Sequence, residues 1–393
     1  MTSAEWMELE DATQLNTYRK WPISLESGRG AWVVDTDGKR YLDLYGGHCV
    51  VFTGHNHPAV VQAVKDQADK LLFYSNAVYS PARARASAAL AALAPKGMGN
   101  IFFINSGAEA NETAMKIARK ATGRSGIVAM EGDFHGRSLG ALSVTWQAPY
   151  RKGHESSFGP VTFVPFGDAE KTCAVIRESK PAAVIIEPIQ STAGMRTAPV
   201  SFFRLVAAAC KEAGSMLIMD EVQSGIGRTG AFTYSQVLGI EPDMITFAKS
   251  LGGGVPVGAV LIRDEVAATV GYGDQGTTFG GAPLAMAAVE ATLKVLIDEN
   301  LTERSVQIYD RFEKGCNERG LRIQGAGCLI GIDFGQPMGA FATDLREKGI
   351  LVGGSTDPNI MRLMPPGVVT DAEIDSFFAA LDEILASKME VVA

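Results

Sequence analysis

The sequence predicts an α/β fold that contains a mostly parallel, buried sheet. Short apolar runs, most of them rich in β-branched residues, Met or Phe, alternate with helical patterns through the middle of the chain. The runs are NIFFIN, SGIVAM, VTFVPF, AAVIIEP, SMLIMDE, DMITFAK and GAVLIR. Because parallel strands are buried on both faces and are joined by crossover helices, this alternation is typical of a parallel sheet. The 393 residues also exceed one ordinary domain, so we expect two domains.

The first part of the chain predicts small β elements followed by helices. The stretch GRGAWVVDTDGKRYLDLYGG carries a turn signal at Asp35 to Gly38 between β-branched and aromatic residues, which indicates two short strands. From about Pro58, AVVQAVKDQADKLL and PARARASAALAALAP place apolar residues at helical spacing. Helices are also predicted between the sheet runs, in GAEANETAMKIARKATG and SFFRLVAAACKEAG.

The last part of the chain predicts a smaller α+β unit. Apolar periodicity indicates helices in MAAVEATLKVLIDEN, IYDRFEKGCNERG and DAEIDSFFAALDEILASK, with short strands near CLIGIDF and IMRLMPP. We therefore expect an N-terminal segment at 1–57 that joins the small domain, a large α/β domain at 58–285, and a C-terminal small α+β domain at 286–393.

Composition excludes several classes of protein. Hydrophobic residues make up 46% and charged residues 20%, a globular mixture without the bias of disordered chains. The net charge of −8 and the lack of a Lys/Arg block argue against a nucleic-acid partner. The five cysteines form no C-x-x-C pair, which argues against a disulfide framework. The N-terminus is acidic and no apolar run approaches ~18 residues, so we expect a cytoplasmic protein without a membrane partner.

One helix start has the form of an anion-binding site. NSGAEANETAMKIARKATG follows the apolar run IFFI, and the spacing of Ser106 and Glu109 predicts a capping box, with Gly123 as the helix stop. The end of such a helix presents unpaired backbone N–H groups and a positive dipole, so Ser106, Gly107 and Ala108 could hold a phosphate. When the segment is taken alone, an ordinary capped helix is the favoured interpretation.

Two further strand ends carry ionisable groups. Asp220 and Glu221 follow the run SMLIM, and Lys249 follows DMITFA and precedes three glycines. Ligands of open α/β sheets gather at the carboxyl ends of strands. Taken separately, Asp220 could simply cap a loop, and Lys249 could simply be a solvated surface charge. Together, an anion cradle, an acid and an amine match the phosphate, ring nitrogen and aldehyde of pyridoxal phosphate.

The segments LIMDEVQSGIGRTG and PDMITFAKSLGGG resemble the signature of class III (subgroup II, fold type I) pyridoxal-phosphate aminotransferases. The chain is similar to the acetylornithine and ornithine aminotransferase branch over roughly residues 18–380. The segments that carry this similarity are GKRYLDLYGG, GHNHPAVVQAV, FFINSGAEANETAMKIARKATG, GDFHGRSLGALSVT, AAVIIEPIQ, QGTTFGGAPLA and IMRLMPP. The resemblance implies fold type I, with a mostly parallel seven-stranded sheet in the large domain, and pyridoxal phosphate as cofactor.

The resemblance also implies roles for individual residues. Lys249 would form the Schiff base and then move a proton between substrate and cofactor carbons, and Asp220 would hold a proton on the pyridinium nitrogen. The remaining cofactor contacts that it implies are Phe134 on the ring face, Gln223 near the phenolic oxygen, and Gly107 with Ala108 at the phosphate. Thr278 matches a threonine that reaches the phosphate of the neighbouring subunit's cofactor, which implies a homodimer with shared active sites.

Three residues match substrate contacts of this branch. Arg137 in FHGR matches an arginine that binds a substrate carboxylate, a task suited to a planar bidentate fork, although a surface arginine is the alternative. Thr277 matches a position that touches acetylornithine, and Arg362 matches the second carboxylate-binding arginine. One position departs from the branch, because EPIQSTAG has Thr192 where many relatives that accept ω-amino donors have a Glu that pairs with the second arginine. The identity of the donor, and the group that neutralises Arg362, therefore stay open.

We predict an aminotransferase that moves the terminal amino group of N2-acetylornithine to 2-oxoglutarate by a ping-pong mechanism. The products would be N-acetylglutamate 5-semialdehyde and glutamate, as in arginine biosynthesis. Another ω-amino donor, namely ornithine, N-succinylornithine, a lysine derivative or 4-aminobutyrate, is the nearest alternative. An epimerase or decarboxylase on the same scaffold is an alternative of a different class, and a cofactor-free interaction protein is a third.

The histidines predict no metal site. His55 and His57 form an H-x-H pair, but no third or fourth ligand stands at a usual spacing. His135 lies in the FHGR segment and is a candidate for supporting the cofactor residues. His48 and His154 receive no role from the sequence.

Overall fold

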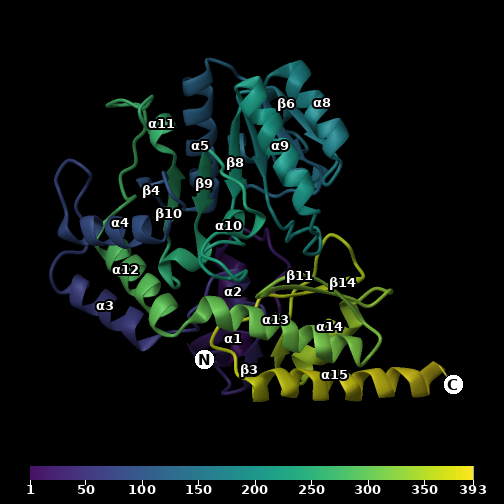
Figure 1. Ribbon diagram of the computed structural model, residues 1–393. Helices are drawn as coiled ribbons and strands as arrows, with labels where there is room; N and C mark the ends of the chain where they lie inside the picture. Colours follow the sequence, from purple (N-terminus) through teal and green to yellow (C-terminus); the bar gives the residue numbers. More distant parts are fainter. Residues whose placement is uncertain (393) are drawn as a thin grey trace.

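The computed structural model describes residues 1–392, and its centre is a seven-stranded sheet, drawn in the upper half of Figure 1. The strand order is β4-β10-β9-β8-β7-β5-β6, and β10 alone runs antiparallel to its neighbours. The strands are β4 (Asn100–Ile104), β5 (Ile127–Met130), β6 (Val161–Val164), β7 (Ala183–Ile186), β8 (Met216–Asp220), β9 (Met244–Phe247) and β10 (Gly258–Ile262). The predicted α/β fold class is confirmed.

Hydrophobic cores lie on both faces of this sheet. Along β5, Val128 belongs to one core and its neighbour Ala129 to the other, as period-two alternation requires. Helix α5 (Gly107–Thr122) supplies Ala114 and other residues to the core of one face, whereas α8 (Ala169–Ser179) and α9 (Val200–Ala213) cover the other face. Burial on both sides explains the continuous apolar runs of the sequence.

A four-stranded sheet joins the two ends of the chain. It has the order β1-β2-β3-β13, and β13 pairs parallel with β3. Its strands are β1 (Leu25–Arg29), β2 (Trp32–Asp35), β3 (Arg40–Asp43) and β13 (Ile350–Leu351). The turn signal does separate β2 from β3, but the sequence did not predict β1, because LESGR is mostly exposed and has no apolar alternation.

The remaining elements surround these two sheets. An antiparallel three-stranded sheet contains β11 (Arg322–Ala326), β12 (Leu329–Asp333) and β14 (Ile360–Leu363). The longer helices are α1 (Ser3–Thr13), α3 (Pro58–Ala68), α4 (Pro81–Leu93), α12 (Pro283–Asp298), α13 (Leu301–Asn317), α14 (Gly339–Glu347) and α15 (Asp371–Val392). The short ones are α2 (Gly46–Cys49), α6 (Leu139–Ser143), α7 (Ala148–Arg151), η1 (Glu155–Ser157), α10 (Tyr234–Leu238), η2 (Lys249–Gly252) and α11 (Asp264–Ala267).

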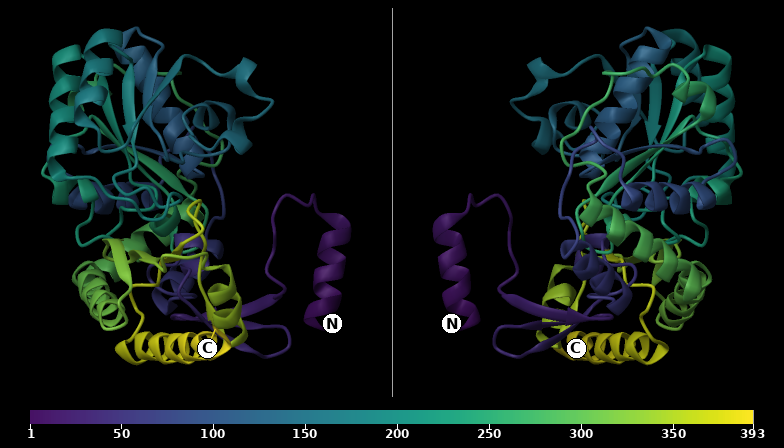
Figure 2. Two further views of the ribbon diagram at one scale, coloured as in Figure 1. Left: turned by 90° about the vertical axis from the view of Figure 1, so that its right-hand side faces the viewer. Right: turned by 90° about the vertical axis from the view of Figure 1, so that its left-hand side faces the viewer.

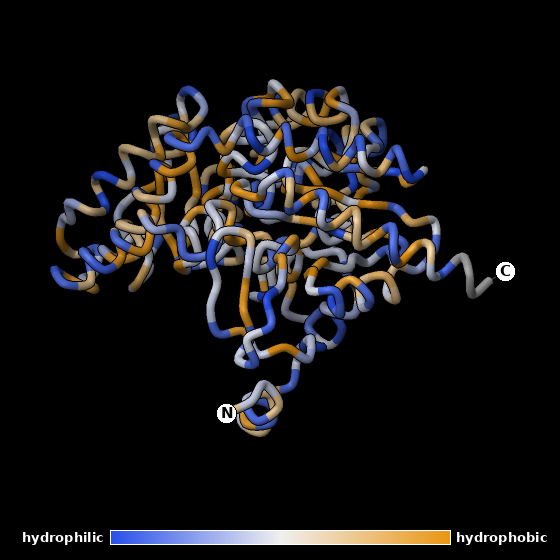
Figure 3. The backbone as a smooth tube through the Cα atoms, turned by 90° about the horizontal axis from the view of Figure 1, so that it is seen from below, coloured by the Kyte–Doolittle hydropathy of each residue, from blue (hydrophilic) through white to orange (hydrophobic). Residues whose placement is uncertain are grey.

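Helix α1 stands apart from the rest of the molecule on an extended arm (Figure 2), and the view from below shows the same projection (Figure 3). The Ser3 hydroxyl lies 2.8 Å from the Thr36 hydroxyl, which ties this helix to the turn after β2. The division into parts at 1–57, 58–285 and 286–393 stays a proposal. Within residues 1–392, no helix has the length and apolar character needed to cross a membrane.

Candidate active site

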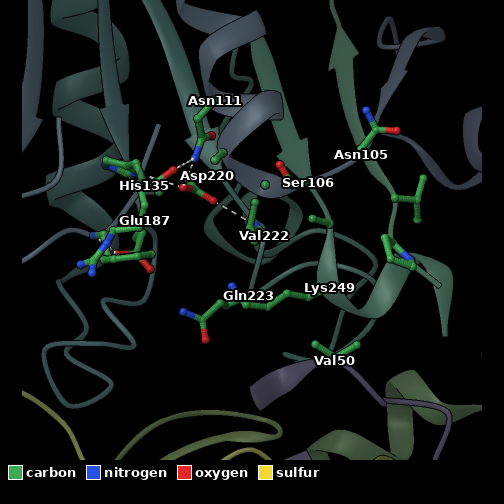
Figure 4. A pocket seen from close by; sticks show the side chains of 18 of the residues that line it. Val50, Asn105, Ser106, Asn111, His135, Glu187, Asp220, Val222, Gln223 and Lys249 are labelled. Atoms are coloured by element: carbon green, nitrogen blue, oxygen red, sulfur yellow. Dashed lines mark hydrogen bonds and ion pairs between the residues drawn. The ribbon is translucent and has the colours of Figure 1, made fainter. Parts of the chain in front are cut away.

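A cavity of about 470 Å³ opens at the carboxyl ends of the sheet strands. In an open α/β sheet this edge is where ligands bind. Most of the sequence-predicted site residues line this cavity, namely Ser106, Gly107, Ala108, Phe134, Arg137, Asp220, Gln223 and Lys249. Asp220 ends β8, and Lys249 stands two residues beyond the end of β9. Figure 4 shows Lys249 and Gln223 in the same pocket as Asp220.

The N-terminus of α5 forms one wall of the cavity. Ser106 is the N-cap, and its hydroxyl accepts a hydrogen bond from the Glu109 backbone N–H over 3.2 Å. The predicted capping box is incomplete, because the Glu109 carboxylate accepts instead from the backbone N–H of Asn105, at 2.9 Å. A Cβ atom on Gly107 would lie 2.9 Å from the side chain of Val222, so only glycine fits there without displacement. The backbone N–H groups at this helix start could hold a phosphate.

Asp220 is held as a buried anion by several donors. Its Oδ2 accepts hydrogen bonds from His135 Nδ1 and Asn111 Nδ2, each at 2.7 Å, and its Oδ1 accepts from the Val222 N–H at 3.0 Å (Figure 4). Burial opposes the charge of Asp220, but these bonds, led by that from His135, hold its pKa below the ordinary value. The carboxylate therefore stays ionised, as a partner of a protonated ring nitrogen requires.

His135 is the cation of this network. Its Nε2 lies 3.3 Å from the carboxylate of Asp133, so the imidazole stands between two acids. Burial alone would lower the pKa of His135, but the hydrogen bonds and charges of Asp133 and Asp220 outweigh it and raise the pKa to about 10. The sequence named His135 only as a candidate support, and it missed Asn111 and Asp133, since contacts between distant segments leave no local pattern.

Glu187 is a second acid in the cavity that the sequence analysis missed. It follows β7, so the same rule of strand ends that singled out Asp220 could have found it. Burial, together with the charges of Asp133 and Asp220, raises its pKa well above the ordinary value. Its Oε1 accepts a hydrogen bond from the Phe134 N–H at 2.6 Å. The surroundings of Glu187 therefore disfavour its charged form.

Lys249 has the properties of a reactive amine. Burial lowers its pKa, and the charge of Arg362 acts in the same direction, while Cys49, Asp220 and Glu187 oppose this shift. The residue has a φ of 39°, in the left-handed region that non-glycine residues rarely adopt. A lysine with a lowered pKa releases its proton readily, as bond formation with a carbonyl requires.

The cavity therefore fits pyridoxal phosphate. The helix start offers N–H groups, Asp220 an anion and Lys249 an amine, and all of them line one space. Gln223 adds a buried Oε1 that has no hydrogen-bond partner among the described residues, so it is available to a ligand.

A family model described as aminotransferase class-III matches residues 13–385. The chain is a class-III aminotransferase. An acetylornithine aminotransferase of Archaeoglobus fulgidus is 42% identical over 371 residues, covering 94% of this chain and 98% of that protein. An ornithine aminotransferase of an Exiguobacterium species is 36% identical over 396 residues, covering 97% of each chain. The predicted branch of the class-III aminotransferases is thus confirmed.

Solved class-III structures agree with this fold. The ornithine aminotransferase of Toxoplasma gondii superposes with a TM-score of 0.92 at 27% identity, covering 99% of this chain and 96% of that chain. The acetylornithine aminotransferase of Elizabethkingia anophelis gives a TM-score of 0.86 at 31% identity, covering 97% and 98%. A second structure of the Toxoplasma enzyme contains pyridoxal phosphate at partial occupancy in its active site. Pyridoxal phosphate is the cofactor of this class-III aminotransferase.

Of the three predicted substrate residues, Arg137 lines the cavity, and Thr277 and Arg362 do not. Arg137 lines the cavity, and its guanidinium carbon lies 3.6 Å from the centre of the Tyr150 ring, so it is held by a cation–π contact. Thr277 does not line it, and its hydroxyl accepts a hydrogen bond from the Gly280 N–H at 3.0 Å. Thr278 is exposed and also lies outside the cavity of its own chain.

Arg362 lies on β14. It is buried, its Nε donates to the Gly354 carbonyl, and its Nη1 donates to the Ser191 hydroxyl at 3.2 Å. Thr192 is half-buried, and its carbonyl accepts a hydrogen bond from the Thr356 N–H at 2.9 Å. Among the described residues, no acidic side chain forms an ion pair with Arg362.

Proposed function

We propose that this class-III aminotransferase transfers the terminal amino group of N2-acetylornithine to 2-oxoglutarate. The products would be N-acetylglutamate 5-semialdehyde and glutamate, as in arginine biosynthesis. Relatives named acetylornithine aminotransferase, at 38–42% identity, support this choice. The ornithine aminotransferases among the relatives make ornithine the principal competitor.

The charges in the cavity favour an N-acylated donor over ornithine, and this observation carries the proposal. Glu187 and Asp220 are the acids among the described lining residues. Burial raises the pKa of Glu187, which disfavours its charged form, and Asp220 is already bonded to His135. An α-ammonium group of ornithine would therefore enter a space in which Asp220 is already paired with His135 and in which Arg137 lies nearby. Acetylation removes that positive charge and leaves one carboxylate for Arg137.

The residues around the cofactor then have defined tasks. When bound, pyridoxal phosphate supplies an aldehyde that bonds to an amine and a ring that takes up the electrons of a breaking C–H bond. The Lys249 amine moves the proton of that bond between the substrate and cofactor carbons. The Asp220 carboxylate holds the ring nitrogen protonated, while His135 and Asn111 hold Asp220 in place. The helix start at Gly107 and Ala108 binds the phosphate.

Two arginines match the two carboxylates of the acceptor. We assign the distal carboxylate of 2-oxoglutarate to Arg137, which also binds the single carboxylate of acetylornithine in the other half-reaction. The α-carboxylate of the acceptor is assigned to Arg362, whose positive charge reaches Lys249. Arg362 therefore binds a carboxylate only in the half-reaction with 2-oxoglutarate, and not in the half-reaction with acetylornithine. Thr277 is proposed to contact the donor from the side of the cavity near Asn105, to whose amide it is bonded over 3.4 Å.

A homodimer with shared active sites is part of this proposal. Thr278 is exposed next to Phe279, an exposed aromatic residue whose ring centre lies 5.0 Å from that of Phe73. Exposed apolar residues also occur on the projecting helix α1, at Trp6 and Leu9. Large exposed apolar surfaces mark protein interfaces.

The homodimer is tested by its mass and by one variant. Light scattering should give twice the 41.7 kDa mass of the chain. Thr278→Ala should weaken cofactor binding, because the proposed contact with the neighbouring subunit's cofactor is lost. A stable, active monomer would contradict the shared active site.

The donor is tested in one half-reaction. The enzyme in its pyridoxal phosphate form is mixed separately with N2-acetylornithine, ornithine, N-succinylornithine and 4-aminobutyrate, and its conversion to the pyridoxamine phosphate form is followed by absorbance. Acetylornithine should convert the enzyme fastest, and ornithine slowly. Rapid conversion by ornithine would contradict the charge argument, and conversion by glutamate alone would exclude all ω-amino donors. Turnover without any keto acid would instead indicate an epimerase or decarboxylase.

A further inference from the structure

The side chain of Arg362 is held by two neutral oxygen atoms. Its Nε donates to the Gly354 carbonyl, and its Nη1 donates to the Ser191 hydroxyl over 3.2 Å. Both Arg362 and Ser191 are buried. Among the described residues no acidic side chain forms an ion pair with this guanidinium. Buried charged side chains are usually paired with an opposite charge, so two neutral partners are an unusual arrangement.

The first partner belongs to the backbone that flanks Arg362. Gly353, the residue before Gly354, pairs with Arg362 across a β-bridge, with N···O distances of 2.8 and 2.9 Å. On the other side, Arg362 pairs with Gly331 of β12. The backbone of Arg362 is therefore fixed from both sides, and the Gly354 carbonyl anchors the Nε end of its side chain.

The second partner, Ser191, comes from a tight turn in a distant part of the chain. Gln190 and Arg196 form an antiparallel bridge at the base of this turn. The Ser191 carbonyl accepts hydrogen bonds from the backbone N–H groups of Gly194 and Met195, at 3.0 and 3.3 Å. The backbone of Ser191 is thus set by the hydrogen bonds of the turn itself.

The turn packs on β14, the strand that carries Arg362. The Thr192 carbonyl accepts a hydrogen bond from the Thr356 N–H at 2.9 Å, in the segment that leads into this strand. A Cβ atom on Gly194 would lie 3.3 Å from the Ile360 side chain, so the turn and the strand are in close contact. The Ser191 hydroxyl is therefore placed against the guanidinium by packing between two defined elements.

The direction of the hydrogen bonds follows from the groups present. An arginine side chain can only donate, so the Ser191 oxygen accepts from Arg362. The single proton of the Ser191 hydroxyl is directed to the Met364 sulfur, 3.9 Å away, which is a weak acceptor. Ser191 therefore offers Arg362 a lone pair and no negative charge.

Part of the guanidinium remains free. The Gly354 carbonyl accepts from Nε and the Ser191 hydroxyl accepts from Nη1, whereas nothing among the described residues accepts from Nη2. A guanidinium binds a carboxylate through two parallel N–H groups, and it has more N–H groups than these two partners use. The two partners therefore orient the guanidinium without cancelling its charge.

We propose that Ser191 is a positioning residue for the acceptor, whose hydroxyl orients Arg362 for the α-carboxylate of the keto acid and leaves the guanidinium charge intact. The assignment rests on the proposed use of Arg362 for that carboxylate. A neutral partner does not have to be displaced from the guanidinium, as a buried carboxylate would have to be. A side chain that is already ordered also loses less freedom when the ligand binds.

The test is a cycle of Ser191→Ala, Arg362→Met and the double variant. Ser191→Ala removes only the hydroxyl, and Met is a long, neutral replacement for Arg. Ser305→Ala is the matched control, because Ser305 is also fully buried and its hydroxyl lies 3.2 Å from the Gly227 carbonyl and 2.7 Å from the Thr302 carbonyl. Binding of 2-oxoglutarate to the pyridoxal phosphate form is measured by titration calorimetry, because a keto acid has no amino group to transfer.

Ser191→Ala should bind 2-oxoglutarate about fivefold more weakly than the wild type, since an arginine with one anchor must be ordered when the ligand binds. Arg362→Met should bind it more weakly still. Adding Ser191→Ala to Arg362→Met should have no further effect, because the hydroxyl acts through the guanidinium. Ser191→Ala should not change binding of 4-oxopentanoate, which has a methyl group in place of the α-carboxylate. Ser305→Ala should change neither affinity.

Unchanged or tighter binding of 2-oxoglutarate by Ser191→Ala, an equal loss with 4-oxopentanoate, or additive effects in the double variant would overturn the positioning role. An error in the proposed use of Arg362 gives a different pattern. Arg362→Met would then bind 2-oxoglutarate as the wild type does, and the role of Ser191 would fall with that assignment. The melting temperature and cofactor absorbance of each variant show whether it is folded and loaded.

Discussion

At the scale of single residues, the site works by fixing the charge of each group. Asp220 stays negative and His135 positive because each is the other's partner, whereas burial, together with the charges of Asp133 and Asp220, raises the pKa of Glu187. The sequence predicted Asp220 and Lys249 from their places after apolar runs. It could not predict the raised pKa of Glu187, because that shift depends on neighbours that only the folded chain brings together.

Asp220→Asn should retain the cofactor but lose activity. An amide cannot hold the ring nitrogen protonated, so kcat should fall by about 100-fold or more, a typical loss for a missing electrostatic stabiliser. Steady-state kinetics and cofactor absorbance measure the two properties separately. Asp243→Asn is the matched control, since that carboxylate accepts from the Leu217 N–H at the other end of β8, at 2.7 Å. Equal losses in both variants would contradict a specific role.

The charge of His135 also predicts how stability depends on pH. Its pKa is about 10 in the folded protein, above the ordinary 6.5, so the folded state binds this proton more tightly than the unfolded state does. The stabilisation is complete below pH 6.5 and disappears as the pH rises through about 10. The melting temperature of the holoenzyme should therefore fall between pH 7 and 10, and less steeply in His135→Asn. Parallel curves for the two proteins would exclude this origin.

At the scale of elements, strand ends and one helix start form the site. Helix α5 begins at Gly107 and ends before Gly123, whose φ of 67° gives the left-handed cap that the sequence predicted. A long helix such as α5 can be predicted because its apolar periodicity and its end residues are visible in one continuous stretch of sequence. The left-handed turn at Gly46 to Cys49 was not predicted, since Asp43 and the packing of distant segments hold its backbone.

Gly107→Ala should weaken cofactor binding. The new Cβ atom would stand 2.9 Å from Val222 and push the helix start away from its place in the cavity. Overpacking of this size costs about 1–3 kcal/mol, so the dissociation constant of pyridoxal phosphate should rise about tenfold. Equilibrium dialysis of the cofactor measures it. Gly126→Ala is the control, because its Cβ atom would meet nothing closer than 3.9 Å, and a comparable effect there would remove the steric explanation.

At the scale of the whole molecule, a fully buried arginine connects distant segments. Arg228 donates through Nη1 to the Pro365 carbonyl at 3.0 Å and through Nη2 to the Ser250 hydroxyl at 3.3 Å, and it lies over the Phe52 ring. Ser250 follows Lys249 directly. This link could not be predicted, because an arginine in a glycine-rich loop carries no sign of burial.

Arg228→Leu should destabilise the enzyme. The Pro365 carbonyl and the Ser250 hydroxyl would lose a donor, and buried groups left unpaired cost about 1–3 kcal/mol each. Denaturant unfolding should show a lower midpoint, together with reduced cofactor retention as the segment of Lys249 loosens. Arg177→Leu, at an exposed pair with Glu212, should leave the midpoint nearly unchanged. An unchanged midpoint in Arg228→Leu would show that the link contributes no stability.

Arg362, which is proposed to bind the α-carboxylate of the acceptor, lies on β14 near the C-terminal end of the chain, whereas Asp220 ends β8 and Gly107 begins α5. One of the two proposed carboxylate contacts can therefore change while the central sheet and α5 stay as they are. Grafting the segment of β14 between related enzymes would exchange that contact while Arg137 and Asp220 are inherited unaltered, which makes this architecture a natural starting point for recombination.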